Sequence, residues 1–485
     1  MKEESLKEKT AKGLFWGGMN NGVQQLLGLA FGILLGRLLS PSDYGMIAMI
    51  AVFSLIASEL QNSGFRVALV NLKQPTAEDY NSVFWFNILV GTGLYVLLFL
   101  AAPLIARYYH EPALVPLSRY AFLGFVFASF GTSQAAYLFK NLRAKQMAKA
   151  GMTAVLVSSC VGVVMAWRGC SYWSLATQTN LFVLINTLLF WHYSEWRPTL
   201  HIDFGPVRRM FGFSVKILIS NILIHVNANV LNILLGRYYS ARDTGYYNQA
   251  YQWNFKCVSL IQGMVKQVDQ PVLSGLADDA ARQLRVLRKM VRFTAFIAFP
   301  ALLGFGLVAH EFIVLAITAK WAASAQFLQL LCLAGALMPL NTLLSDAIVA
   351  KGRSDIFMWS TLAYAVLQVG LMIGLYPYGI RTMVVAYVVL TAGWFFVWHF
   401  FVRRLTGYAL PMVLRDTVPF ALAAAAVMAA VHFLTRSLEP LWLLLLVRVV
   451  LAAVLYYLVM RIARVKILDD CTRFLLSRFN PNKQS

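Results

Sequence analysis

Apolar runs long enough to cross a lipid bilayer follow one another along the whole chain. A membrane-spanning helix needs about 17–25 mostly apolar residues, and no long polar block separates these runs. Of the 485 residues, 59% are hydrophobic and only 13% are charged, whereas soluble domains carry about 25% charged residues. The sequence therefore predicts an all-α, polytopic membrane protein, with no soluble catalytic domain.

Fourteen membrane spans are expected, with boundaries uncertain by several residues. They lie at 14–36, 44–68, 81–106, 114–138, 147–167, 172–193, 210–235, 244–272, 289–318, 323–349, 355–376, 382–402, 412–434 and 441–461. An even number of spans places both termini on one side. The lysines and arginines near the span ends divide 29 to 8 in favour of that side. Because positive residues collect on the cytoplasmic side, we expect both termini to be cytoplasmic.

The net charge of +21 follows from this topology. In a soluble protein it would suggest nucleic acid, but here the basic residues lie mainly between spans, so no nucleic-acid partner is expected. The five cysteines are scattered and form no C-x-x-C pair, which indicates neither a metal site nor a disulfide framework. No cofactor is expected. The basic tail, 463–485, suits either a short helix on the inner membrane surface or a solvated end.

One stretch of sequence occurs twice. Residues 33–45 read ILLGRLLSPSDYG and residues 233–245 read ILLGRYYSARDTG, with eight of thirteen positions identical at an offset of 200. Each copy ends one span and begins the next, and six spans separate the copies, so the repeat is parallel. The predicted domains are two parallel six-helix bundles, 1–208 and 209–404, then two additional spans in 405–462 and the cytoplasmic tail 463–485.

The repeated stretch favours a corner between two helices over a substrate contact. Ser40 suits an N-cap, Pro41 suits the first helical position, and Asp43 lies in the first turn, near the positive end of the helix. Gly36 allows a close approach where the preceding helix ends. Arg37 and Arg237 are expected to anchor the corners at the outer membrane interface.

Five stretches, in their order along the chain, resemble a known family. They are KTAKGLFWG near the start, GRLLSPSDYG, SVFWFNILVGTGLYVLLFLAAPLIARYYHEP at 82–112, GRYYSARDTGYYNQAYQ at 236–252, and FPALLGFGLVAHEF followed by KW within 299–321. Together they are similar to the Wzx-like lipopolysaccharide and exopolysaccharide exporters, the polysaccharide flippase branch of the multidrug/oligosaccharidyl-lipid/polysaccharide exporter superfamily. The resemblance covers about residues 8–405, and the last two spans match in number more than in text.

The resemblance implies a flippase of the bacterial inner membrane. Such a protein moves an oligosaccharide linked to a polyprenyl, usually undecaprenyl, pyrophosphate from the inner to the outer leaflet. Alternating access by rocking of the two halves would drive this step of surface polysaccharide biosynthesis. The implied partners are the lipid-linked oligosaccharide, membrane lipids and a glycan polymerase or assembly machinery. A proton or sodium gradient is an open question, and so is the identity of the glycan.

Polar side chains concentrate on the first, second, seventh and eighth spans, which are symmetry mates under the repeat. On the eighth span, positions 248, 252, 256, 259, 263, 266 and 270 share one helical face. On the seventh, positions 221, 225, 229 and 232 do the same. Polar groups facing lipid are costly, so these faces are expected to line a water-filled cavity between the halves. A single Asn or Gln could instead bond to a neighbouring helix.

Twelve residues of these faces are the predicted substrate-binding set. They are Asn21, Gln24, Gln25, Asn62, Arg66, Lys216, Asn221, His225, Asn229, Gln252, Lys256 and Lys266. A pyrophosphate needs Lys or Arg as cation and donor, and Lys256 is favoured because it lies deep in its span. Arg66 and Lys266 could instead snorkel to the inner interface.

Glu59 is the candidate for ion coupling. It would either pair with a nearby cation or carry a proton. His225 could titrate near physiological pH, although a lone histidine in a polar stripe is more often a simple hydrogen-bonding residue. No acidic cluster indicates a sodium site.

Two other functions compete with the flippase. A drug or small-cation antiporter of the same superfamily would need acidic cavity residues, whereas this set holds more Lys and Arg than Asp and Glu. An integral-membrane glycan-processing enzyme usually carries its catalytic residues on large outer loops. Here the outer loops are short, and no carboxylate pair with a histidine, Ser/His/Asp group or phosphate-binding glycine loop is apparent. The sequence therefore predicts a transporter without catalytic residues.

Overall fold

The computed structural model describes residues 6–62, 69, 72, 74–266, 272–273, 275, 279–465 and 467–469, in which helices alternate with short turns and no strand occurs. Within these ranges the side chains of 6–14, 61–62, 206, 208–221, 223–224 and 280 are not described. The predicted tail therefore falls mostly outside the described residues. The chain forms two compact units, Met1–Gly245 and Tyr246–Ser485. The predicted bundles, 1–208 and 209–404, rest on the sequence repeat and stay a prediction.

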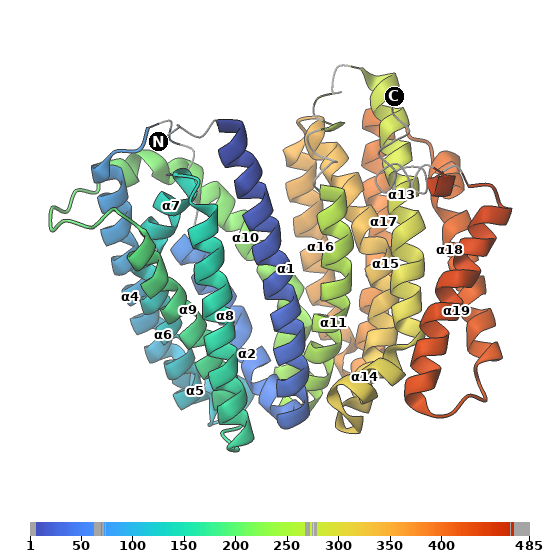
Figure 1. The fold of residues 1–485 in the computed structure, drawn as a ribbon, viewed down its shortest axis with the longest axis horizontal. Helices are drawn as coiled ribbons and strands as arrows, with labels where there is room; N and C mark the ends of the chain where they lie inside the picture. Colours follow the sequence, from blue (N-terminus) through green and yellow to red (C-terminus); the bar gives the residue numbers. More distant parts are fainter. Residues whose placement is uncertain are drawn as a thin grey trace. The chain divides into compact units, whose positions relative to one another are not determined.

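The helices of the first unit are α1 (Leu6–Leu38), α2 (Pro41–Asn62), α4 (Ala77–Tyr109), α5 (Leu114–Ala121), α6 (Leu123–Ser129), α7 (Thr132–Lys140), α8 (Ala144–Trp167), α9 (Trp173–Tyr193) and α10 (Gly205–Tyr238). Figure 1 shows α8 between α1 and α9, and α8 packs on both. α10 packs on α2 and α4. A cluster that includes Met49, Tyr109, Leu114 and Phe122 forms the core where α2, α4 and α5 meet.

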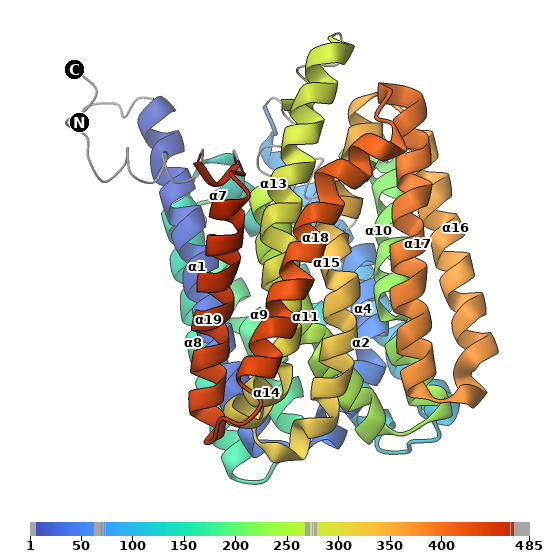
Figure 2. The same ribbon diagram turned by 90° about the vertical axis from the view of Figure 1, so that its right-hand side faces the viewer.

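The helices of the second unit follow α11 (Ala241–Lys266), whose first turn belongs to the first unit. They are α13 (Ala280–Leu307), α14 (Ala309–Ile317), α15 (Ala322–Ala350), α16 (Ser354–Leu375), α17 (Ile380–Thr406), α18 (Leu410–Leu434) and α19 (Leu441–Ile462), with short 3-10 turns at Ala319–Trp321 and Tyr376–Tyr378. α15 packs on α13 and α17, while α18 packs on α13 and α19 (Figure 2).

A helix occupies each of the fourteen predicted span ranges. Nine helices of the described part are long and apolar enough to cross a membrane, or ten if the bent α5–α7 segment is one span. The remaining ranges belong to α1, α9, α10 and α11. Three of these carry the polar faces predicted above, which lower their mean hydropathy. The multi-pass, all-helical class is confirmed, and the count of fourteen crossings stays a prediction.

The fourth predicted span, 114–138, is not one continuous helix. It consists of α5, α6 and α7, and a bend of 43° separates α7 from the preceding segment. Carbonyls freed at such breaks need donors when they lie in an apolar environment, and α9 supplies them. Asn180 donates to the Tyr120 carbonyl at 2.7 Å, Thr187 to Phe127 at 3.1 Å and Trp191 to Phe130 at 2.6 Å.

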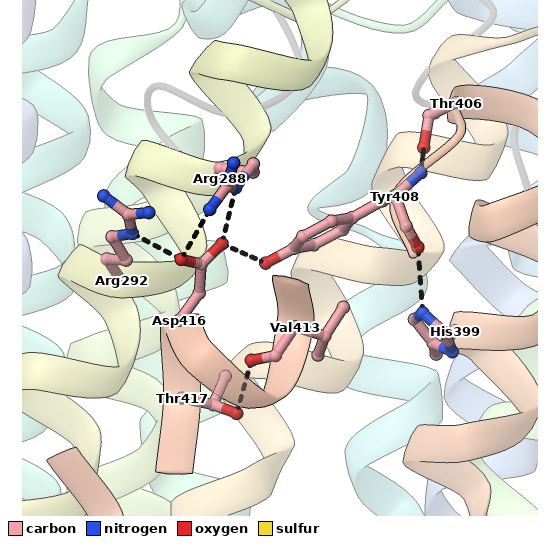
Figure 3. Close-up of polar contacts among 8 residues, drawn as sticks. All are labelled: Arg288, Arg292, His399, Thr406, Tyr408, Val413, Asp416 and Thr417. Atoms are coloured by element: carbon pink, nitrogen blue, oxygen red, sulfur yellow. Dashed lines mark hydrogen bonds and ion pairs between the residues drawn. The ribbon is translucent and has the colours of Figure 1, made fainter. Parts of the chain in front are cut away.

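A buried carboxylate ties α18 to α13. Asp416 is fully buried and accepts from Arg288 at 2.8 and 3.1 Å and from Arg292 at 2.6 Å (Figure 3). The Tyr408 hydroxyl donates to the same carboxylate at 2.9 Å. Burial and the charge of Asp416 raise the pKa of Tyr408, so the phenol keeps the proton that it donates. Asp416 therefore has the partners that a buried charge requires.

A second buried ion pair ties α19 to α14. Arg448 donates to Glu311 Oε1 at 2.7 Å, and both side chains are less than a tenth exposed. The same arginine donates to the Thr435 hydroxyl at 3.0 Å. Each helix of the C-terminal pair is thus held by one charged residue. α18 contributes an acid to a contact with α13, and α19 contributes a base to a contact with α14. Asp416, Glu311 and Arg448 all lie inside predicted spans. A charged residue within an apolar span is the signal in the sequence that could have identified them.

Asp416→Asn is expected to destabilise the protein because it leaves two arginines facing a neutral amide. Breaking a fully buried pair costs about 3–5 kcal/mol. Here a loss on the order of 2 kcal/mol is expected, since the arginine side chains are 27% and 42% exposed. Thermal unfolding of the purified protein in detergent measures it. The matched control is Asp355→Asn, in an exposed pair with Arg353, which should leave the Tm unchanged. Equal shifts for both variants would contradict the anchoring role.

Candidate functional site

The predicted residues of α1 divide between a helix contact and an open face. Gln24 Nε2 donates to Asn20 Oδ1 at 2.8 Å. Both amides lie against Gly151 of α8, where an added Cβ would come within 2.5 Å of Gln24 Nε2. Asn21 and Gln25, by contrast, are exposed. Gln24 therefore packs against α8, and its part in substrate binding stays a prediction.

Four predicted residues cannot be placed as side chains. Asn62, Lys216 and Asn221 lie in helices whose side chains are not described at these positions, and Arg66 lies outside the described residues.

The structure brings together two residues that the sequence pattern nominated separately, Glu59 on α2 and His225 on α10. His225 Nε2 lies 3.0 Å from Glu59 Oε1, and the two side chains are 31% and 24% exposed. One and two turns further along α10, Asn229 donates to the His225 carbonyl at 3.0 Å and Asn232 to Asn229 Oδ1 at 3.4 Å. The polar stripe of α10 is thus a connected series of hydrogen bonds that reaches α2 at Glu59.

The polar stripe of α11 lies opposite the face by which this helix packs. The packed face holds Trp253, Asn254, Val258, Ile261 and Val265, all of which are buried. It contacts α14 through the rings of Trp253 and Phe312, and α15 where Asn254 and Val258 meet Gly335. Gln252, Gly263 and Lys266, on the predicted stripe, are exposed, and Lys256 and Ser259 are partly buried.

Lys256 is held by an aromatic ring. Its Nζ lies 4.3 Å from the centroid of the Trp253 ring, an arrangement that favours a cation electrostatically. In the part of the chain that the structure describes, Lys256 forms no ion pair. Trp253 is not among the predicted residues, although an aromatic residue three positions before a lysine on a helix is a usable signal.

Both corners have a helix cap, of which only the one at Ser40 was predicted. Ser40 Oγ donates to Asp43 Oδ2 at 2.7 Å and accepts from the Asp43 amide at 3.3 Å. The second corner repeats this geometry, with Ser240 Oγ to Asp243 Oδ2 at 2.6 Å and the Asp243 amide to Ser240 Oγ at 3.1 Å. The predicted N-cap at Ser40 is confirmed.

Arg237, at the end of α10, packs on the corner between α4 and α5. Its guanidinium donates to the Tyr108 carbonyl and lies 3.0 Å from the His110 ring nitrogens.

In the described residues, no group of three or more His, Cys, Asp or Glu is placed to hold a metal ion.

A protein-family comparison decides the identity of the chain. The family described as "Polysaccharide biosynthesis protein" matches residues 34–326, more than half of the chain. The chain belongs to this family. The predicted resemblance to polysaccharide exporters is thereby confirmed. The matched region includes both corners, α2, α10 and α11, and it ends before α18 and α19.

Individual relatives agree with this assignment. The lipopolysaccharide biosynthesis protein WzxC of Escherichia coli K12 is 28% identical over 358 residues, 73% of this chain and 72% of WzxC. The teichuronic acid biosynthesis protein TuaB of Bacillus subtilis is 24% identical over 360 residues, 74% of each chain. Both proteins are thus similar to this chain along most of their length.

Solved structures share the fold. An inward closed structure of the lipid II flippase MurJ superposes with a TM-score of 0.73 at 14% identity, covering 92% of this chain and 98% of MurJ. An inward-facing multidrug resistance transporter of the MATE family and MOP superfamily gives 0.63 at 15% identity, covering 80% and 96%. At these identities the likeness shows the fold alone.

Single cysteines along α11, in a chain whose native cysteines have been replaced, should report its two faces. Cysteines at 252, 263 and 266 are expected to react with a membrane-impermeant maleimide added to both sides of the membrane, because these positions are exposed. Cysteines at 250, 258 and 261 are buried and should stay unlabelled. Ser259→Cys and Val258→Cys form an adjacent matched pair. Equal labelling around the helix would contradict an open polar face.

Proposed function

We propose that the protein is a flippase that moves a polyprenyl-pyrophosphate-linked oligosaccharide from the inner to the outer leaflet of the bacterial inner membrane. Membership of the polysaccharide biosynthesis family supports it, as does similarity to proteins named for lipopolysaccharide and teichuronic acid biosynthesis. A succinoglycan biosynthesis transport protein, ExoT of Rhizobium meliloti, is a further relative. The fold shared with a lipid II flippase fits the same activity.

The observation that carries the proposal is the open polar face of α11. A face with Lys256, Lys266 and Gln252 is too costly to turn toward lipid, so a hydrated path is the economical surrounding. Lys256 supplies a cation for a phosphate oxygen, and the amides supply partners for sugar hydroxyls. The ring of Trp253 holds the ammonium group in place. The undecaprenyl chain would stay in the bilayer.

Glu59 and His225 are the proposed coupling pair. His225 Nε2 and Glu59 Oε1 lie within hydrogen-bonding distance, 3.0 Å apart, which is the geometry that a proton relay requires. In the described residues, no third His, Cys, Asp or Glu joins this pair in a group that could hold a cation. We therefore favour a proton gradient over a sodium gradient.

The remaining parts of the proposal follow from the charge distribution and the repeat. Both termini are cytoplasmic, and the fourteen helices cross the inner membrane as two six-helix bundles and a C-terminal pair. Alternating access moves the substrate, and a glycan polymerase or assembly machinery receives it.

A drug or small-cation antiporter of the same superfamily is the second candidate, because the MATE fold is shared. It is less supported, since Glu59, the acid predicted for the cavity, is hydrogen-bonded to His225. A glycan-processing enzyme is less supported again, because relatives are named for transport or flipping.

Lys256→Ala should lower surface polysaccharide export by about 10- to 100-fold, since a hydrogen bond to a charged group contributes about 1.5–3 kcal/mol. Lys256→Arg should retain part of the activity because it keeps the cation. Export is measured as surface glycan in a strain that lacks the gene and carries each variant at equal membrane level. Arg381→Ala, which removes an exposed cation, is the control. Normal export by Lys256→Ala would remove this lysine from the path.

Glu59→Gln should uncouple transport from the proton gradient while keeping a hydrogen-bond acceptor beside His225. In proteoliposomes, flipping by the parent is expected to slow when the gradient is collapsed, whereas flipping by Glu59→Gln should be equally slow with and without it. Glu195→Gln, in an exposed pair with Arg143, should behave as the parent. A Glu59→Gln variant that still responds to the gradient would show that Glu59 is not the carrier.

A further inference from the structure

The two copies of the repeated corner pack directly against each other. A Cβ added to Gly45 would lie 1.7 Å from the carbonyl oxygen of Ala241, and one added to Gly245 would lie 1.8 Å from the carbonyl oxygen of Pro41. The relation is reciprocal, because each glycine meets the first helical residue of the other copy. Both obstacles are main-chain atoms, which cannot rotate away as a side chain can.

Glycine is required here by contact and not by backbone conformation. Both residues lie in helices, Gly45 in α2 and Gly245 in α11. Two other helical glycines of the same unit, Gly28 and Gly93, have no atom within 4 Å of an added Cβ. Small residues let helix backbones approach closely in membranes, and in this crossing the approach leaves no room for one methyl group.

The contact continues along the end of α10. A Cβ on Gly236 would lie 2.8 Å from atoms of both Met49 and Tyr109, which are themselves buried. Gly236 and Gly245 belong to the same copy of the repeat, so the second corner fits closely against α2 and α4 at two points. The first turns of α2 and α11 cross at the glycines.

Each helix end at this crossing is electrostatically compensated. The N-terminus of a helix carries a partial positive charge, so bringing two of them together is unfavourable unless each is neutralised. Asp43 and Asp243 lie in the first turns and complete the caps with Ser40 and Ser240. Asp43 also accepts from the Ser171 hydroxyl. The charge at each helix end is therefore compensated by a residue of its own corner.

We propose that Gly45 and Gly245 form a joint that closes the outer end of the transport path and opens to release the substrate to the outer leaflet. The inference rests on the proposed flippase function and on the outer placement of the corners. Because Ala241 also packs against the buried apolar cluster of α2, α4 and α5, separating the corners costs free energy, which binding of the substrate has to supply. Any side chain at either glycine holds the corners apart.

The test measures the corners and transport separately. In the full-length chain with its native cysteines replaced, nitroxide labels are placed at Leu38→Cys and Tyr238→Cys, equivalent and exposed positions of the two copies. Electron–electron distance distributions are recorded in lipid nanodiscs for the parent, Gly45→Ala, Gly245→Ala and the control Gly93→Ala. The parent and Gly93→Ala should show a short-distance population. Gly45→Ala and Gly245→Ala should each lose it and export at least tenfold less glycan.

Each outcome decides one part of the inference. A short-distance population retained by Gly45→Ala and Gly245→Ala overturns the joint. Its loss with export equal to that of the parent overturns the role of the joint in transport and leaves the flippase function standing. If cells lacking the gene keep their surface polysaccharide, the proposed function fails, while the distances still decide whether the joint exists.

If the glycine variants do not accumulate in the membrane, a second measurement on the parent protein tests the joint instead. The labelled parent is then recorded during turnover with lipid-linked oligosaccharide extracted from the producing strain. The short-distance population should decrease as substrate is added. A distribution that stays unchanged during turnover overturns the opening of the joint.

Discussion

An unsatisfied polar group is costly in the bilayer, and the charged residues inside the helices of this chain illustrate two ways of meeting that cost. Asp416 and Glu311 are buried and are bonded to arginines. Glu59 is bonded to His225. Lys256, Gln252 and Lys266, in contrast, lie on the face of α11 opposite the one that packs, where Gln252 and Lys266 are exposed and Lys256 is partly buried. The bonded charges stabilise the fold, and the exposed ones require water, which the proposed transport path would supply.

The charged residues of the C-terminal helix pair hold these two helices to their neighbours, and we assign them no role in transport. α18 is tied to α13 through Asp416, and α19 is tied to α14 through Arg448 (Figures 2 and 3). Charges that have good partners and many hydrogen bonds resist rearrangement, because separating them exposes each to a low-dielectric surrounding. α18 and α19 are thus expected to move with α13 and α14 as one body. The matched family region ends at residue 326, before these helices.

Local features of the fold could be predicted, and contacts between distant segments could not. The span positions follow from apolar runs, and the cap of Ser40 with Asp43 spans three residues. The Glu59–His225 and Asp416–Arg288 contacts join residues 166 and 128 positions apart, and one sequence contains no signal for such pairing. The break within 114–138 escaped prediction for the same reason, because donors such as Thr187, on another helix, stabilise it. For the α11 stripe, helical periodicity alone was sufficient.

The repeat has a physical explanation in the reciprocal crossing. When two equivalent corners meet symmetrically, every contact occurs twice. Gly45 contacts the backbone of the second corner, and the equivalent Gly245 contacts the backbone of the first. A glycine at 45 alone would not allow the contact, because a side chain at 245 would still strike the Pro41 carbonyl. The requirement therefore acts on both copies at once, whereas side chains on the rest of each half can change independently. This accounts for the glycine that both copies have at the equivalent positions 45 and 245.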